Sequence, residues 1–215
     1  MPKKLITWLS IICFSFCYGC AHYHYQDDLF KCPVLPSAIK INKAIGMNEL
    51  LDNRPNDEKG YFPPDNLCNK FQAENQTVSK RITEVLLKNF QESGLFKEIH
   101  FSVQPQDNYV INGSIERLVM KSKSTFWTSN PLVGIFPPLQ FPVLFGVAFN
   151  QQYCIVDISL EVRNNQTNTI TASIRASSRV VLNMSIYDSE AGKDVTEAFC
   201  NVVNQLKKEL SEKIK

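Results

Sequence analysis

The clearest pattern in the chain is an alternation of apolar and polar residues over 154–163. One side of this segment carries only apolar or thiol side chains, those of Cys154, Val156, Ile158, Leu160 and Val162. A period of two residues is that of a half-buried strand. A polar turn at 164–167 follows, and the alternation resumes over 170–176. The pattern predicts a β-hairpin.

Shorter alternations predict further strands over 39–45, 99–103 and 109–119. A stretch of charged turn-forming residues at 52–66 predicts a long surface loop. Two segments have helical spacing instead. The first begins near Asn75 or Thr77 and ends at Gly94, with its apolar stripe on Val78, Ile82, Val85, Leu86 and Phe90.

The second helical segment begins at Asp194, where Glu197 lies three residues further on in the spacing of a capping box. Its stripe comprises Val195, Ala198, Phe199, Val202, Val203, Leu206, Leu210 and Ile214. Each helix has a single apolar stripe and must cover one face of a sheet. The predicted fold class is therefore α+β: a two-layer sandwich of a mainly antiparallel sheet, with two amphipathic helices on one face and a long apolar insertion.

The apolar insertion lies between the strands and contains no Asp, Glu, Lys, Arg or His from Ser124 to Val156. Four prolines at 131, 137, 138 and 142 exclude a membrane-spanning helix, since each internal proline costs about 3 kcal/mol. The segment 126–149 either covers the core or contacts a partner or the lipid headgroup layer, and loops of this length are usually functional. The expected contact residues are Phe126, Trp127, Phe136 and Phe141.

The amino terminus has the composition of a secretory signal. Lys3 and Lys4 precede an apolar run from Leu5 to Tyr18, which is too short for a membrane span of about 20 residues. Gly19-Cys20 resembles the lipobox of bacterial lipoproteins, in which the cysteine becomes the lipidated first residue. Cys17 is the alternative site, and an uncleaved anchor or a plain secreted protein are the alternative fates.

The resemblance implies a signal peptide at 1–19, palmitate or a related acyl chain on Cys20, and a tether over 20–37. A single α+β domain follows over 38–215, with its apolar insertion at 124–153. In Gram-negative lipoproteins an Asp after the cysteine commonly retains the protein at the inner membrane. Residue 21 is Ala, so the resemblance implies the outer membrane.

Charge argues against a nucleic-acid partner. The chain has 23 Lys and Arg against 21 Asp and Glu, and the first nineteen residues hold two of the bases and none of the acids. The remaining chain is therefore formally neutral, whereas nucleic-acid binders normally have a basic surplus.

Four cysteines remain after processing: Cys32, Cys68, Cys154 and Cys200. An oxidising compartment makes two disulfides possible in three connectivities. We prefer Cys32–Cys68 and Cys154–Cys200. No spacing fits a zinc site. His22 and His24 are interpreted as part of a polar tether, although a weak metal site there is the alternative.

The motifs of common catalytic sites are missing from the sequence, including phosphate-binding glycine loops, GxSxG and HExxH. His100 has no nucleophile that the sequence pairs with it, and we expect a surface residue. Asp157 and Glu161 would lie about 13 Å apart along one strand, further than paired glycosidase carboxylates. No catalytic residue, metal or cofactor is predicted.

The arrangement resembles a group of bacterial envelope lipoproteins related in fold to the amino-terminal domain of the Tol-system translocation protein and to the curli-secretion channel lipoprotein. The matching features are the helix end Phe90–Ile99, the strand Asp107–Glu116, the 154–176 hairpin and the terminal helix. The apolar insertion departs from that group, so pore formation does not follow.

The expected function is that of a non-enzymatic, periplasm-facing outer-membrane lipoprotein, an accessory or assembly subunit of an envelope complex. Its partners would be the membrane, through the lipid anchor, and an envelope protein or further copies of itself. The alternative is a transport auxiliary or carrier that shelters an apolar ligand.

Overall fold

The computed structural model describes residues 24–25, 30–59, 77–125, 148, 150–185 and 190–214. These residues divide into two compact units. The main unit contains residues 30–59, 77–121, 153–181 and 193–214, and the small unit contains the other described residues. The residues that flank the apolar insertion group with residues 24–25 in the small unit.

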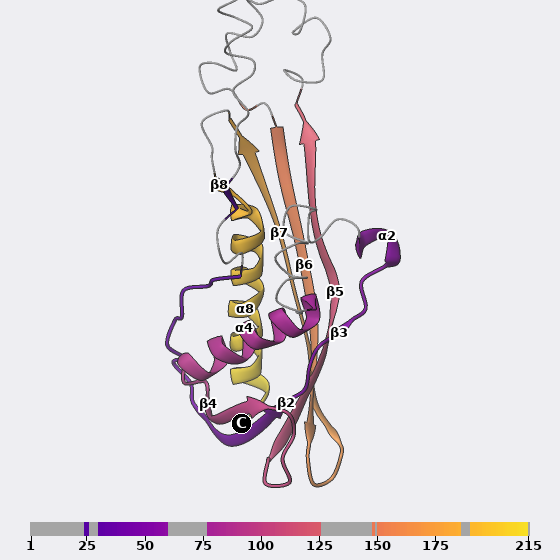
Figure 1. Cartoon of the computed structure of the whole chain (residues 1–215). Helices are drawn as coiled ribbons and strands as arrows, with labels where there is room; N and C mark the ends of the chain where they lie inside the picture. The colour runs from indigo at the N-terminus through magenta and orange to yellow at the C-terminus, as the bar shows by residue number, and fades with distance from the viewer. Residues whose placement is uncertain are drawn as a thin grey trace, which may run out of the picture. The chain divides into compact units, whose positions relative to one another are not determined.

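The predicted two-layer α+β sandwich is confirmed. The sheet has six strands in the order β4-β2-β5-β6-β7, and β3 pairs with β5 beside this path. In Figure 1 the strand β6 runs opposite to β5 and β7. The strands are β2 (Ile41–Met47), β3 (Leu51–Asp52), β4 (Phe96–Phe101), β5 (Tyr109–Ser124), β6 (Asn150–Asn164) and β7 (Ile170–Met184).

The short strands pair in parallel, which the predicted mainly antiparallel sheet did not include. β2 is parallel to both β4 and β5, and β3 is parallel to β5. The helix α4 (Val78–Glu92) lies in the chain between β2 and β4. Two adjacent parallel strands need such a crossover connection, whereas the β6–β7 hairpin needs only a short turn.

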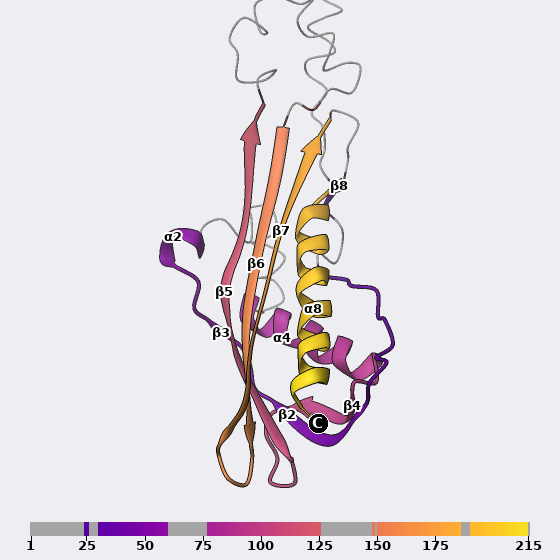
Figure 2. The same cartoon turned by 180° about the vertical axis from the view of Figure 1, so that it is seen from behind.

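Two long helices cover one face of the sheet, α4 and α8 (Lys193–Lys213) (Figures 1 and 2). The side chain of Thr77 caps α4 by accepting a hydrogen bond from the Lys80 amide at 3.1 Å. Gly94 ends it in the left-handed conformation, with φ of 64°. The predicted start and end of α4 are thus both confirmed.

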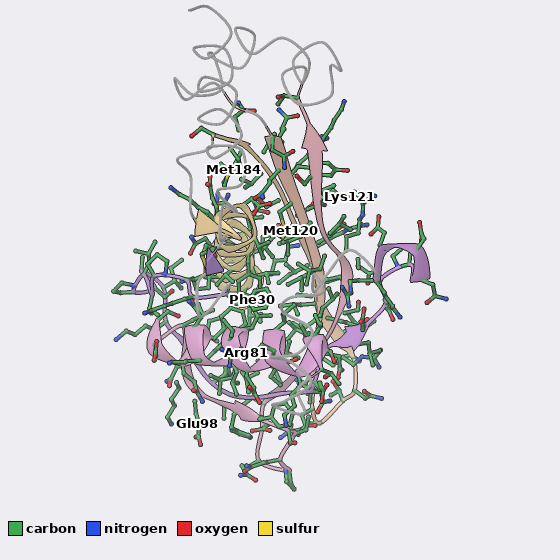
Figure 3. All side chains as sticks on the ribbon, turned by 45° about the horizontal axis from the view of Figure 1, so that its top comes forward. Phe30, Arg81, Glu98, Met120, Lys121 and Met184 are labelled. Atoms are coloured by element: carbon green, nitrogen blue, oxygen red, sulfur yellow. A yellow bond between two sulfur atoms is a disulfide. The ribbon has the colours of Figure 1, made fainter. Side chains whose placement is uncertain are left out.

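The core is formed by the inward rows of β6 and β7 and by the stripes of the two helices. All five inward residues predicted for β6 are buried, and so are Ile82, Leu86 and Phe90 of α4. Figure 3 shows Phe30 directed into this interior. Ile170 is exposed, so the inward row of β7 begins only at Ala172. Three further elements are short: β1 (His24–Tyr25), α2 (Asn56–Lys59) and β8 (Glu190–Ala191). The strand β8 pairs with β1.

Two predicted local features differ in the structure. Residues 56–59 of the expected surface loop form the helical turn α2, which an ion pair between Glu58 and Arg117 of β5 holds in place. The helix α8 begins at Lys193, so Asp194 lies inside the first turn and does not cap the helix. The side chain of Asp194 is fully buried.

Burial raises the pKa of the Asp194 carboxyl, and the backbone amides of Val195 and Asp194 oppose this effect in part. Neither carboxylate oxygen makes a hydrogen bond of normal geometry. The thiol of Cys154 lies nearby in the core, and its pKa is raised by burial and by the charge of Asp194. A carboxylate in this position destabilises the folded state whenever it is ionised.

We therefore predict that Asp194→Asn raises the thermal midpoint at pH 7. The Asp194 carboxyl binds its proton more tightly in the folded state than in the unfolded state, so its protonation stabilises the wild-type protein at low pH. This stabilisation is lost as the pH rises from about 4 through the raised pKa. One pKa unit corresponds to about 1.4 kcal/mol, and each kcal/mol moves the midpoint by roughly 2–4 °C in a protein of this size. Thermal unfolding from pH 4 to pH 8 measures the effect.

The difference between the variant and the wild-type protein should shrink as the pH falls toward 4. Glu197→Gln on the same helix is the matched control, and its midpoint should follow that of the wild type. If the difference in midpoint between Asp194→Asn and the wild-type protein were no larger at pH 7 than at pH 4, this account of Asp194 would be contradicted.

Candidate interaction surface

The amino-terminal arm, residues 30–39, packs against the two long helices of the main unit, α4 and α8. Phe30 is 1% exposed and meets Phe199 of α8 edge-on, with their ring centroids 5.0 Å apart. The amide of Ser37 donates to the carbonyl of Ser93 at 2.9 Å, at the end of α4. This part of the predicted tether is therefore built into the body of the protein.

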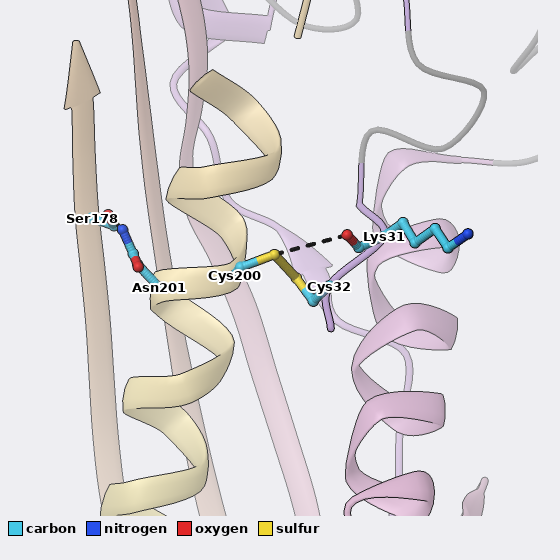
Figure 4. Close-up of a disulfide and its surroundings, with 5 residues drawn as sticks. All are labelled: Lys31, Cys32, Ser178, Cys200 and Asn201. Atoms are coloured by element: carbon cyan, nitrogen blue, oxygen red, sulfur yellow. Dashed lines mark hydrogen bonds between the residues drawn. A yellow bond between two sulfur atoms is a disulfide. The ribbon is translucent and has the colours of Figure 1, made fainter. Parts of the chain in front are cut away.

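A disulfide joins Cys32 of the arm to Cys200 of α8, with their α-carbons 5.3 Å apart (Figure 4). In the same figure the Cys200 sulfur lies beside the carbonyl of Lys31, at 4.0 Å. The bond spans a sequence separation of 168 residues. It fixes the beginning of the arm to a helix from the end of the chain.

Both predicted disulfide pairings are wrong, because Cys32 and Cys200 are bonded to each other. Cys154 is a free thiol, fully buried in the inward row of β6. Cys200 follows Phe199 and lies off the apolar stripe that faces the sheet, so it cannot approach Cys154. Cys68 lies outside the described residues.

Two grooves follow the arm. One lies between the arm and α4, with a volume of about 310 Å³. The other, which we name the α8 groove, lies between the arm and α8 and has a volume of about 290 Å³. Six of the residues that line the α8 groove are Leu35, Ser37, Ile39, Asn204, Lys207 and Lys208.

The α8 groove has a cation at its wall and aliphatic side chains along the arm. Lys207 is 8% exposed, and its Nζ donates one long hydrogen bond to the carbonyl of Leu35 at 3.4 Å. Burial lowers the pKa of Lys207. Leu35 and Ile39 are 55% and 50% exposed. A buried charge and exposed aliphatic side chains thus line the same groove.

The outer face of the sheet is polar, and it carries two ion pairs from β6 among the described residues. Asp157 of β6 accepts from the Arg175 guanidinium of β7 at 2.6 Å, and Glu161 pairs with Arg163. Asp157 and Glu161 thus pair with two different arginines. A shallow depression of about 450 Å³ lies on this face, lined in part by Ser114, Ser159 and Ser173.

Two of the hydroxyl groups of this depression, those of Ser114 and Ser159, make hydrogen bonds. Ser114 and Ser159 lie 2.8 Å apart, and both donate to the carboxylate of Glu116. Within the described residues, the Glu116 carboxylate that the two hydroxyls share is the base they contact. The cluster joins β5 to β6 across the outer face, which is a structural role.

His100 is the histidine of the main unit, and its side chain contacts a buried carboxylate. Its Nε2 lies 3.2 Å from Asp107, a carboxylate that is 2% exposed and also accepts from the Gln104 amide at 2.6 Å. His100 is therefore not a free surface residue. The pair fixes the 102–108 loop against Gly46, where a Cβ would come within 2.5 Å of the Asp107 carboxylate.

Within the described parts of the chain, no group of three or more His, Cys, Asp or Glu residues is placed to hold a metal ion. None of the helices in the described part of the chain is long and apolar enough to cross a bilayer. The predicted lipidation residue Cys20 and the predicted contact residues Phe126, Trp127, Phe136 and Phe141 lie outside the described residues.

Sequence reasoning missed Lys207, although the sequence contains a signal for it. Lys207 directly follows Leu206 and lies three residues before Leu210, so it borders the apolar stripe of α8. The residues Cys200, Asn204, Lys207 and Ser211 repeat at i, i+4, i+7 and i+11, which places them on one helix face. This second stripe faces the arm.

No protein-family model matches the chain, and no curated protein is similar to it in sequence. Among solved structures, the chain is similar to a Xanthomonas campestris protein of the family DUF330, with 11% identity, 84% of this chain and 89% of that chain covered, and a TM-score of 0.49. A putative neuraminyllactose-binding hemagglutinin homolog from Helicobacter pylori has 13% identity, covers 89% and 92%, and has a TM-score of 0.47.

A third similar structure is the PelC dodecamer from Paraburkholderia phytofirmans, with 9% identity, 84% and 95% covered, and a TM-score of 0.39. Several others are described as lipoproteins of Neisseria meningitidis, Caulobacter crescentus and Acinetobacter baumannii. At these identities and TM-scores a structural likeness does not transfer a function. The function has to be argued from the residues of the chain.

We predict that Cys200→Ser lowers the free energy of unfolding by about 2–5 kcal/mol, because the disulfide closes a very long loop. The thermal midpoint should fall by roughly 5–15 °C. Differential scanning calorimetry under non-reducing conditions measures the change. A proteolytic digest of the oxidised wild-type protein should contain the peptides of Cys32 and Cys200 linked together.

The matched control is Cys32→Ser, which removes the same bond from its other end. Both single variants and the double variant should have the same midpoint, because each lacks the same interaction. Additive losses in the double variant, or peptides of Cys32 and Cys200 recovered separately from the oxidised protein, would contradict the assigned bond.

Proposed function

We propose that this protein is a non-enzymatic bacterial lipoprotein, anchored by an acyl chain on Cys20 to the periplasmic face of the outer membrane. The observation that carries the proposal is the Cys32–Cys200 disulfide. A structural disulfide is typical of an oxidising compartment such as the periplasm. That compartment agrees with the secretory composition of the first nineteen residues.

The position of the disulfide supports the anchoring role. Only twelve residues separate Cys32 from Cys20 in the sequence, and an extended chain spans at most about 3.6 Å per residue. The lipidated residue would then lie within about 50 Å of the α8 helix. Each acyl chain contributes about 0.8 kcal/mol per buried CH₂, so two or three chains hold a neutral body at the bilayer.

The proposed role is that of an accessory or assembly subunit of an envelope complex, with an envelope protein or further copies of this chain as its partner. We also propose that the fold is related to that of the Tol and curli-secretion group, which the sequence resembles. The paired polar groups of the outer sheet face and the His100–Asp107 pair support a body without a catalytic site. The apolar segment 126–149 is the proposed contact with a partner.

We expect Cys20→Ser to abolish lipidation. The precursor should remain uncleaved by the lipoprotein signal peptidase, and it should not incorporate a palmitate analogue in cells. Click-labelling followed by gel electrophoresis measures both effects. Cys17→Ser is the matched control, since it removes the neighbouring cysteine and should leave processing and labelling unchanged.

The wild-type protein should also sediment with outer membranes in a density gradient. Normal labelling of the Cys20 variant would overturn the assigned anchor, and loss of labelling in the Cys17 variant alone would move the site to Cys17. Recovery of the wild-type protein with inner membranes would overturn the proposed location.

Phe136→Asp and Phe141→Asp should each leave the fold intact and abolish association with the partner. A charge at an exposed contact residue costs little in the free protein, whereas a charge buried in the core is strongly destabilising. The measurements are the thermal midpoint and the native mass of detergent-extracted complexes. The prediction would fail if both midpoints dropped by about 6 °C or more, which would assign the segment to the core.

A further inference from the structure

The α8 groove contains a buried cation that has no counter-ion among the described residues. No carboxylate of the described residues lies within salt-bridge distance of the Lys207 ammonium, and its single hydrogen bond to the Leu35 carbonyl is long, at 3.4 Å. Glu212 also lines the groove, but it is not a member of any ion pair among the described residues. A charge removed from water without a partner is costly, so the site is complementary to an anion.

The surroundings of Lys207 indicate what else the anion would carry. Leu35 and Ile39 expose about half of their surface at the same groove, and both are large aliphatic residues. Asn204 and Ser37 contribute polar side chains that can hydrogen-bond to a peptide backbone. A ligand that fits these groups has a carboxylate, aliphatic neighbours and backbone amides.

The size of the groove favours a peptide over a lipid. Its volume of about 290 Å³ lies at the lower end of the range for small-molecule clefts, which is roughly 300–1,000 Å³. A few side chains of a peptide fill such a space, whereas two acyl chains with their headgroup exceed it.

We propose that the α8 groove binds a short segment of a partner protein in which an acidic residue lies between aliphatic residues. The carboxylate pairs with Lys207, and the aliphatic side chains pack on Leu35 and Ile39. The two interactions together give both charge selectivity and apolar burial. This inference deepens the proposed role as an accessory subunit by naming the chemistry of its partner.

The test uses the full-length protein as it is purified from cells in detergent, whatever the state of Cys20, with its lysines labelled by ¹³C reductive methylation for NMR. The probes are the capped peptide Ala-Leu-Glu-Leu-Ala and its counterpart with Gln in place of Glu. The Lys207 signal is assigned by its loss in Lys207→Met. We expect the Glu peptide to shift this signal and to bind at least tenfold more tightly than the Gln peptide, which corresponds to about 1.4 kcal/mol.

Lys207→Met should abolish the preference for the Glu peptide while keeping the thermal midpoint at or above that of wild type, because the variant removes a buried charge and retains the aliphatic stem. Lys80→Met is the matched control. It removes an exposed lysine of α4 that does not line the α8 groove, and its affinity for the Glu peptide should stay within about twofold of wild type.

Three results would overturn the inference: equal affinity for the two peptides, unchanged selectivity in Lys207→Met, or a lowered midpoint in that variant, which would make the lysine a structural residue. Vesicles of phosphatidylglycerol that shift the Lys207 signal when the Glu peptide does not would reassign the groove to lipid. None of these readouts depends on Cys20 processing or membrane fractionation, so failure here and failure of the proposed function are distinguishable.

Discussion

Helix α8 packs against the sheet on one side and against the arm on another, and the structure of the main unit depends on both contacts. Its apolar stripe is buried against the inward rows of β6 and β7. Its second stripe, which begins at Cys200, faces the arm and holds it through the disulfide. The angular step of 100° per residue separates these roles, so Phe199 and Cys200 can serve different layers although they are adjacent in sequence.

The same constraint explains which parts of the fold could be predicted from the sequence. The inward row of β6 and the stripes of α4 and α8 follow from hydrophobic periodicity, because burial of those side chains is the dominant stabilising term. The cap at Thr77 and the glycine at 94 follow from local hydrogen bonding and backbone sterics. Pattern reasoning therefore succeeds where one face of one element decides the structure.

The features that were missed depend on two elements together. Cys154 lies in the inward row of β6, and Cys200 lies off the sheet-facing stripe, so their helical and strand positions already excluded a bond between them. The predicted stripe omitted Cys200, which was the available signal. The parallel pairing of β2 and β4 had a signal too, since a helix lies between them in the sequence. Each error came from treating elements one at a time.

The candidate site shows the same limit. Lys207 has no motif around it, and its importance comes from the arm that buries it, which is some 170 residues away in sequence. Only the pairing of arm and helix turns a lysine at the border of a stripe into a buried cation.

Asp194 and Lys207 are both buried ionisable groups on α8, yet they differ in what surrounds them. Asp194 is fully buried in the core beside the Cys154 thiol, where no exchange with an external ligand is possible without unfolding. Lys207 lines a groove that is open to solvent and bordered by exposed aliphatic side chains. Both groups reduce stability when charged, but only the lysine can be neutralised by a molecule from outside. A departure from the apolar pattern thus indicates an interaction site when it borders an accessible groove, and a property of the core when it does not.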